Sequence, residues 1–188
     1  MLISNDLFGN PNTLWEVRPM ATEKSFLLIV DGEGPGNITV KIYDTDKRLI
    51  FSKGMEPDKA TVKKFNLNSL ELGNYFLYVE DEMKLTVHPL EIKSTGLEID
   101  KKQREIFYHP VVEYDREDGF INVNWFMHQR GDYKMTLENK SLETVFEDKI
   151  SNGLVIHRYY DARKLIPGTY YMTFSNGTQS HVKTIKVR

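Results

Sequence analysis

The feature that most constrains this chain is a short motif that occurs twice at a fixed distance. A leucine, a glycine and a tyrosine in the spacing Leu-x-x-Gly-x-Tyr appear in the first half of the sequence and again 95 residues later. The two copies are Leu70, Gly73 and Tyr75, and then Leu165, Gly168 and Tyr170. The same offset, without a gap, also pairs Val17 with Val112 and Ile92 with Val187. It therefore predicts a tandem duplication with two domains, residues 1–94 and 95–188.

Short runs of alternating apolar and polar residues fill both halves and predict strands. Alternate side chains on a strand share one face, so Ile38, Val40 and Ile42 are expected in a core. In the first half, strands are expected at residues 14–17, 25–30, 38–43, 49–52, 61–65, 74–79 and 84–92. Seven strands per half is the count of immunoglobulin-like domains. The predicted fold is all-β, with two tandem immunoglobulin-like antiparallel β-sandwich domains of about seven strands each.

Turn sequences mark the connections between these strands. The pair Asn176–Gly177 predicts a tight hairpin, whereas the corresponding residues 80–83 are a poorer turn sequence and predict a longer or more mobile one. The small and polar segment 93–96 is the expected junction between the domains.

The repeated motif itself has a structural interpretation. Its leucine is expected to close the end of the sandwich, its glycine to allow a turn, and its tyrosine to point inward at the start of the next strand. This arrangement resembles a tyrosine corner, in which the hydroxyl donates a hydrogen bond to the backbone of the preceding connection. The motif is therefore assigned to the fold and not to a functional site.

Composition excludes several classes of function. The chain has no cysteine, which rules out disulfides and thiol chemistry. A net charge of −2, with 25 basic and 27 acidic residues, gives no broad basic surface for nucleic acid. No apolar run approaches the roughly 20 residues that span a bilayer, and residues 1–12 do not read as a signal peptide. The protein is then either cytoplasmic or an extracytoplasmic protein whose leader is absent from this chain.

No catalytic motif and no cofactor-binding motif is present, so neither an enzymatic reaction nor a cofactor is expected. The five histidines are scattered and predict no metal site, although His157 and His181 could meet across strands. Three acidic groups are candidates for calcium or for ordinary turns: Asp44 with Asp46, residues 80–82, and Asp115 with Glu117 and Asp118. A pocket with two carboxylates from different strands would indicate an enzyme instead.

The candidate partner surface follows from strand alternation. If Ile38, Val40 and Ile42 face the core, then Tyr43 faces outward, and so do Phe76 and Tyr78 on the strand expected beside it. The second half carries Glu138, Tyr171 and Thr173 at the paired positions. The aromatic cluster of Tyr43, Phe76 and Tyr78 has two interpretations, a partner surface and simple cross-strand packing.

The runs Ile38–Ile50 and Phe65–Phe76, together with the ending Val182–Arg188, carry a family resemblance. They resemble the β-sandwich sorting domains that end type IX secretion cargo in Bacteroidetes, and the related immunoglobulin-like and fibronectin type III modules. This resemblance implies an extracytoplasmic, non-catalytic protein that mediates protein or cell-surface interaction or secretion-related attachment. The alternative is a carbohydrate-binding module that uses Tyr43, Tyr78 or Tyr171, so the expected partner is a protein or a cell-surface glycan.

Overall fold

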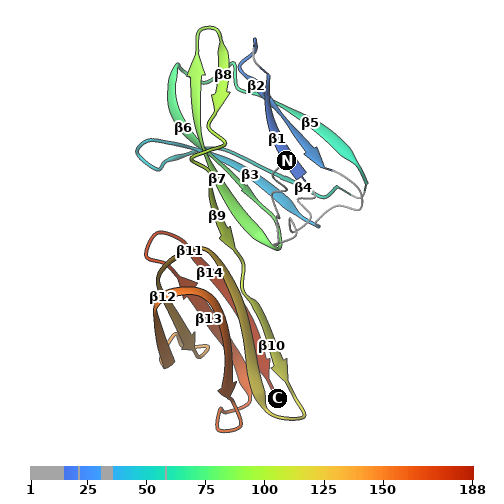
Figure 1. Ribbon diagram of the computed structural model, residues 1–188. Helices are drawn as coiled ribbons and strands as arrows, with labels where there is room; N and C mark the ends of the chain where they lie inside the picture. Colours follow the sequence, from blue (N-terminus) through green and yellow to red (C-terminus); the bar gives the residue numbers. More distant parts are fainter. Residues whose placement is uncertain (1–14, 21, 31–35, 58) are drawn as a thin grey trace, which may run out of the picture. The chain divides into compact units, whose positions relative to one another are not determined.

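The computed structural model describes residues 15–20, 22–30, 36–57 and 59–188, and its regular elements are antiparallel strands (Figure 1). The predicted all-β antiparallel fold is confirmed. The chain splits into two compact units, Met1–Glu105 and Ile106–Arg188. The division therefore lies within β9 (Glu105–Tyr108) and not between residues 94 and 95, where the sequence predicts it.

The first unit contains two sheets. Its strands are β1 (Trp15–Met20), β2 (Ser25–Val30), β3 (Ile38–Asp44), β4 (Leu49–Met55), β5 (Thr61–Asn66), β6 (Gly73–Glu80), β7 (Lys84–Lys93) and β8 (Gly96–Ile99). One sheet has the order β1-β2-β5, and the other contains β4-β3-β6-β7-β8. The strands β1 to β7 lie where the alternation predicts them, with residue 14 of the first one outside the described residues. The early part of the chain, on which the leader prediction rests, also lies outside them.

The eighth strand corrects the predicted junction. Lys93 pairs with Gly96 and Ile92 pairs with Leu97, so residues 93–96 close a hairpin between β7 and β8 and do not link two domains. Gly96 has a φ of 148°, a conformation that favours glycine. Leu97 is buried in the core of the first unit, and this burial explains why the chain turns back before it leaves the unit.

The core of the first unit lies between its two sheets. Phe26 and Leu28 on β2 and Ile42 and Leu77 on the other sheet are fully buried. Phe26 stacks on Phe65 of the neighbouring strand with ring centroids 4.8 Å apart. Ile38, Val40 and Ile42 on β3, which alternation places in the core, are all fully buried.

The second unit has one branched sheet of five strands. These are β10 (Val111–Asp115), β11 (Phe120–Glu138), β12 (Thr144–Asp161), β13 (Gly168–Ser175) and β14 (Ser180–Val187), in the order β10-β11-β13-β14 with β12 beside β11 (Figure 1). The expected number of about seven strands is wrong here, because β11 and β12 are continuous where the first unit has separate strands. Register shifts flank Gly131 in the β11–β12 ladder, and such irregularities let a long strand bend from one layer toward the other.

The strand pairing of the two units agrees at the offset of 95 residues. Val40 pairs with Val79 in the first unit, and Met135 pairs with Phe174 in the second. Even an irregularity recurs, between Ile42 and Tyr43 and again between Leu137 and Glu138. The duplication stays a prediction, and these equal registers support it.

The repeated motif makes the expected hydrogen bond in both units. The Tyr75 hydroxyl donates to the carbonyl oxygen of Glu71 at 3.2 Å, and the Tyr170 hydroxyl donates to that of Ile166 at 2.7 Å. The glycines differ, because Gly73 has a φ of 147° whereas Gly168 is not among the residues with positive φ. The turn role expected of the glycine therefore applies to the first copy alone.

The hairpin after β6 also corrects an expectation. Glu80 pairs with Leu85 as Ser175 pairs with Ser180, so the first hairpin is no longer than the second. Asp81 explains this result, because its Oδ1 accepts the backbone N–H groups of Met83 and Lys84. An aspartate at this position performs the turn role that Asn176 performs in the second unit.

Candidate interaction surface on the first unit

The predicted aromatic cluster forms on the outer face of β3 and β6. Tyr43 pairs directly with Phe76, and Tyr78 lies diagonally from Tyr43 on the same face. The rings of Tyr43 and Tyr78 are 4.7 Å apart at 59°. All three side chains are partly exposed. The structure thus brings together the three residues that the sequence singles out.

Strand β7 enlarges this surface with two residues that the sequence analysis missed. Pro89 pairs with Phe76 and Val87 pairs with Tyr78, so both lie on the outer face beside the aromatic rings. Val87 is only 8% exposed. Alternate side chains of the strand expected at residues 84–92 point outward, and this alternation could have identified both residues.

The second unit carries different chemistry at the equivalent positions. Glu138 pairs with Tyr171, and Tyr171 pairs with Thr184 on β14. Thr173 lies beside Val182, which is more than half exposed. The aromatic cluster is therefore a property of the first unit.

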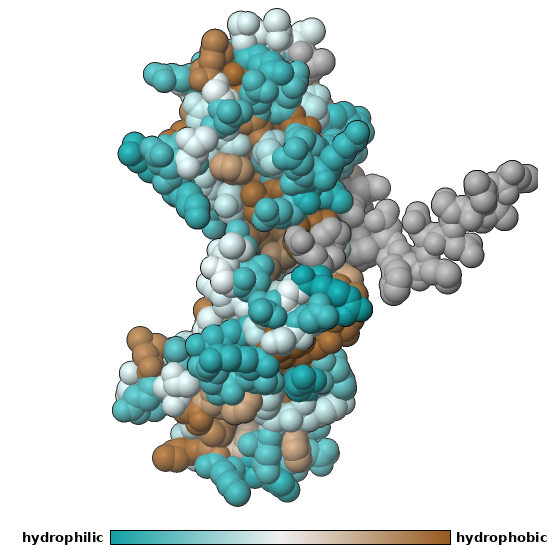
Figure 2. Space-filling model, turned by 60° about the vertical axis from the view of Figure 1, so that its left-hand side comes forward, coloured by the Kyte–Doolittle hydropathy of each residue, from teal (hydrophilic) through white to brown (hydrophobic). Residues whose placement is uncertain are grey.

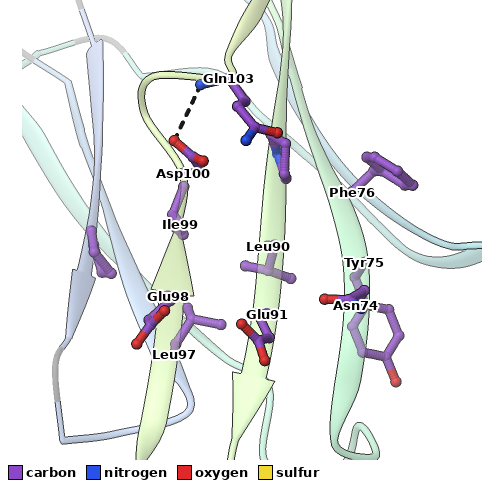
Figure 3. Close-up of a pocket in the computed structure, with 12 residues that line it drawn as sticks. Asn74, Tyr75, Phe76, Leu90, Glu91, Leu97, Glu98, Ile99, Asp100 and Gln103 are labelled. Carbon is purple, nitrogen blue, oxygen red and sulfur yellow. Dashed lines mark hydrogen bonds between the residues drawn. The ribbon is translucent and has the colours of Figure 1, made fainter.

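Apolar side chains reach the surface in patches of both units, with hydrophilic side chains between them (Figure 2). Next to the aromatic cluster, the first unit has an open cavity of about 780 Å³. Phe76 and Pro89 belong to both the cluster and the cavity, and Asn74, Glu91 and Glu98 add polar groups. Figure 3 shows Asn74 and Phe76 on β6, Glu91 on β7 and Glu98 on β8. After β8, the Asp100 carboxylate accepts the backbone N–H of Gln103. The cluster and the cavity form one candidate interaction surface.

Two carboxylates from different strands do meet in this cavity. Glu91 and Glu98 pair directly across β7 and β8. The Lys93 ammonium lies 2.7 Å from Glu98 and 3.3 Å from Glu91, and these carboxylates raise the pKa of Lys93. A catalytic acid and a catalytic base need different environments, so that one carboxyl group is protonated and the other is not. Here the same ammonium group, that of Lys93, pairs with both exposed carboxylates. The pair is best described as a surface ion-pair network.

Two of the three acidic groups named as calcium candidates make turn contacts. Asp44 accepts the backbone N–H of Arg48, whose side chain pairs with Asp46. Asp115 accepts the backbone N–H groups of Glu117 and Asp118. These contacts are those of ordinary turns.

The histidines do not form the pair that the sequence left open. His157 lies on β12 and bonds through Nδ1 to Asn124, while His181 on β14 stacks on His109 with centroids 3.9 Å apart. His157 and His181 are therefore in separate environments.

A buried polar group lies at one end of the first core, and the sequence analysis did not find it. The Trp15 indole donates to the Asp81 carboxylate at 2.6 Å, and the Lys84 ammonium lies 5.2 Å from the Trp15 ring centroid. Burial lowers the pKa of Lys84, and Asp81 opposes that shift.

His88, which is 4% exposed, faces the same core. Burial lowers its pKa to about 4, aided by the charges of Arg104 and Lys101.

Sequence comparison finds one family model that resembles part of the first unit. Residues 23–93 match the secretion system C-terminal sorting domain. The matched segment contains β2 to β7 and the whole aromatic cluster. A type IX sorting domain indicates a protein that is secreted or carried on the cell surface, so the extracytoplasmic localisation is confirmed over the cytoplasmic alternative. Such domains are typically non-catalytic.

Comparison with solved structures gives remote similarities. The biofilm-associated protein BSP domain has a TM-score of 0.32 at 14% identity, over 93% of this chain and 29% of that one. The FN1–FN3 domains of chicken CNTN1 have a TM-score of 0.32 at 10% identity, over 92% of this chain and 63% of that one. The chain thus spans less than two thirds of either structure. No curated protein matches it in sequence. In the described ranges, no helix has the length and apolar character needed to cross a bilayer.

Proposed function

We propose that this is a non-catalytic protein of type IX secretion whose first unit binds a protein partner at the cell surface. The observation that carries the proposal is the aromatic cluster of Tyr43, Phe76 and Tyr78, which lies on one face within the matched sorting domain. Aromatic side chains supply much of the binding energy in protein interfaces.

The architecture supports a binding role for this face. Neighbouring ladders hold the three rings in place, and Lys41 and Glu80 form a 3.5 Å ion pair beside them. An apolar centre with charged residues at its edge is the usual composition of a protein interface.

The test is a triple variant, Tyr43→Ser, Phe76→Ser and Tyr78→Ser, expressed with an epitope tag in a bacterium that uses type IX secretion. The fraction of protein on the cell surface is measured by flow cytometry, and the oligomeric state by light scattering. We expect the surface fraction to fall, or an oligomer to dissociate. The matched control is Tyr171→Ser, a partly exposed tyrosine on the outer face of the second unit. A triple variant with wild-type surface fraction and oligomeric state would refute the proposal.

The second candidate function is glycan recognition by the same surface, which Tyr43 and Tyr78 favour because partly exposed rings can stack on sugars. A glycan array separates the two functions. Binding that is lost in the triple variant supports the glycan, whereas a triple variant that gives the same array signal as the wild type leaves the protein partner as the better explanation.

A further inference from the structure

The second unit has a pocket of its own on the outer face of β10, β11 and β12. The cavity measures about 530 Å³, within the range of small-ligand sites. Its lining includes the side chains of Glu113, Asn122 and Tyr159. None of these residues belongs to the proposed partner surface of the first unit.

The lining residues form a row across the three strands. Glu113 pairs with Asn122, and Asn122 pairs with Tyr159, so one carboxylate, one amide and one aromatic ring lie side by side. Neighbouring strands are about 4.8 Å apart, and the row is therefore about 10 Å long, close to two linked pyranose rings.

The tyrosine is presented as an open platform. Its side chain is 60% exposed, and His157 supports it edge-on, with ring centroids 4.8 Å apart at 88°. A large aromatic surface left open beside polar groups suits a ligand that has both an apolar face and hydroxyl groups.

The charges of the pocket select among such ligands. The lining holds Glu113, Asp115 and Asp118 and, in the part of the chain that the structure describes, no basic side chain. The nearby guanidinium of Arg163 is held by both carboxylate oxygens of Asp161, at 2.9 and 2.8 Å. An anionic ligand would be repelled, whereas carboxylate and amide oxygens accept hydrogen bonds from neutral hydroxyls.

The first unit lacks this arrangement at the equivalent positions. Arg18 pairs with Leu27, and Leu27 pairs with Lys64, so two cations flank an aliphatic side chain. The aromatic and amide row is thus specific to the second unit.

From this geometry we infer that the second unit binds a neutral glycan, with a pyranose ring on Tyr159 and hydroxyls bonded to Asn122 and Glu113. The inference goes beyond the proposed function and does not depend on it. The two use different residues on different units.

Affinity electrophoresis of the full chain tests it, in EDTA, in gels that contain hydroxyethylcellulose, xylan or galactomannan, with alginate as the anionic probe. We expect at least one neutral polysaccharide to retard the wild type and alginate not to. Tyr159→Ala should weaken binding about tenfold or more, Asn122→Ala should weaken it less, and Tyr159→Phe should keep most of it.

Tyr171→Ala and Tyr78→Ala are the matched controls, and both should bind like the wild type. Far-UV circular dichroism checks that each variant is folded, which the exposure of Tyr159 favours. Three results would overturn the inference: a wild type that no neutral polysaccharide retards, retardation by alginate alone, or a Tyr159→Ala variant as retarded as the wild type. Loss of binding in Tyr78→Ala with retention in Tyr159→Ala would assign the glycan to the first unit instead.

Discussion

The two units pair their strands in the same register but differ at the edges of their sheets. In the first unit, β8 pairs with the last four residues of β7. In the second unit, β14 pairs with β13 alone among the described strands. The two units thus share the backbone pairing within their sheets, whereas an added strand such as β8, which covers the edge of β7, is present in the first unit alone among the described strands. Edge strands need such protection because their unpaired N–H and C=O groups can recruit other strands.

The two tryptophans show the same contrast inside the cores. Trp15 lies on β1 and donates to the Asp81 carboxylate. Trp125 lies on β11 and donates to the carbonyl oxygen of Tyr108 at 2.9 Å. The offset pairs Trp15 with Pro110 and Trp125 with Val30, so the large rings fill non-equivalent places. Similar backbones therefore tolerate different solutions to core filling, provided that each buried N–H finds an acceptor.

The largest expected effect tests whether the units unfold independently. Trp125 is 1% exposed and packs against Phe107, Tyr133 and Phe174. Trp125→Ala should destabilise the second unit by about 3–5 kcal/mol, because it leaves a large cavity. Val30→Ala, at the equivalent position of the first unit, should cost about 2 kcal/mol.

Urea unfolding followed by fluorescence and far-UV circular dichroism measures both effects. In Trp125→Ala the remaining fluorescence comes from Trp15 and reports the first unit. We expect its midpoint to match the wild-type first-unit transition, while the circular dichroism shows an earlier loss of structure. A fluorescence midpoint that shifts together with the circular dichroism would show that the units unfold as one.

The next effect is a pH dependence that belongs to the first unit. His88 is its sole histidine, and the equivalent position in the second unit is Lys183. Because burial lowers the pKa of His88 from 6.5 to about 4, folding favours the neutral ring. This contribution is complete above pH 6.5 and is lost as the pH falls toward 4, by about 3 kcal/mol.

His88→Leu supplies the comparison for this measurement, because leucine cannot take up the proton. The free energy of unfolding of the first unit, measured from pH 7 to pH 4, should fall more steeply in the wild type than in the variant. Parallel curves would mean that His88 is protonated in the folded state as readily as in the unfolded one.

The sequence predicted what depends on local alternation and missed what depends on contacts distant in the chain. The strands β1 to β7 and the cluster of Tyr43, Phe76 and Tyr78 follow from side chains that alternate along single segments. The β8 hairpin was missed because residues 93–96 read as a polar linker, and the burial of Leu97 in the core depends on residues far away in the chain. The row of Glu113, Asn122 and Tyr159 depends on how three strands are aligned with one another. The sequence of a single strand does not determine that alignment.

A smaller effect separates the two copies of the repeated motif. Gly73 has a φ of 147°, so Gly73→Ala should cost about 1–3 kcal/mol through backbone strain, although no atom lies within 4 Å of the added carbon. At Gly168 the added carbon meets the Ile166 carbonyl oxygen at an ordinary 3.7 Å, so Gly168→Ala should change stability by less than about 0.5 kcal/mol. Equal losses in the two variants, measured by urea unfolding, would contradict this difference.

The smallest effect concerns the tyrosines of that motif, and it sharpens the comparison between equivalent hydrogen bonds. The Tyr170 bond is 2.7 Å long and partly buried, whereas the Tyr75 bond is 3.2 Å long and exposed. Water can replace an exposed hydrogen bond more readily than a buried one. Tyr170→Phe should therefore cost about 1.5 kcal/mol and Tyr75→Phe about 0.5 kcal/mol in urea unfolding of the respective units. Unchanged stability in both variants would remove the tyrosine-corner interpretation, while a larger loss at Tyr75 would show that burial does not set the strength of this bond.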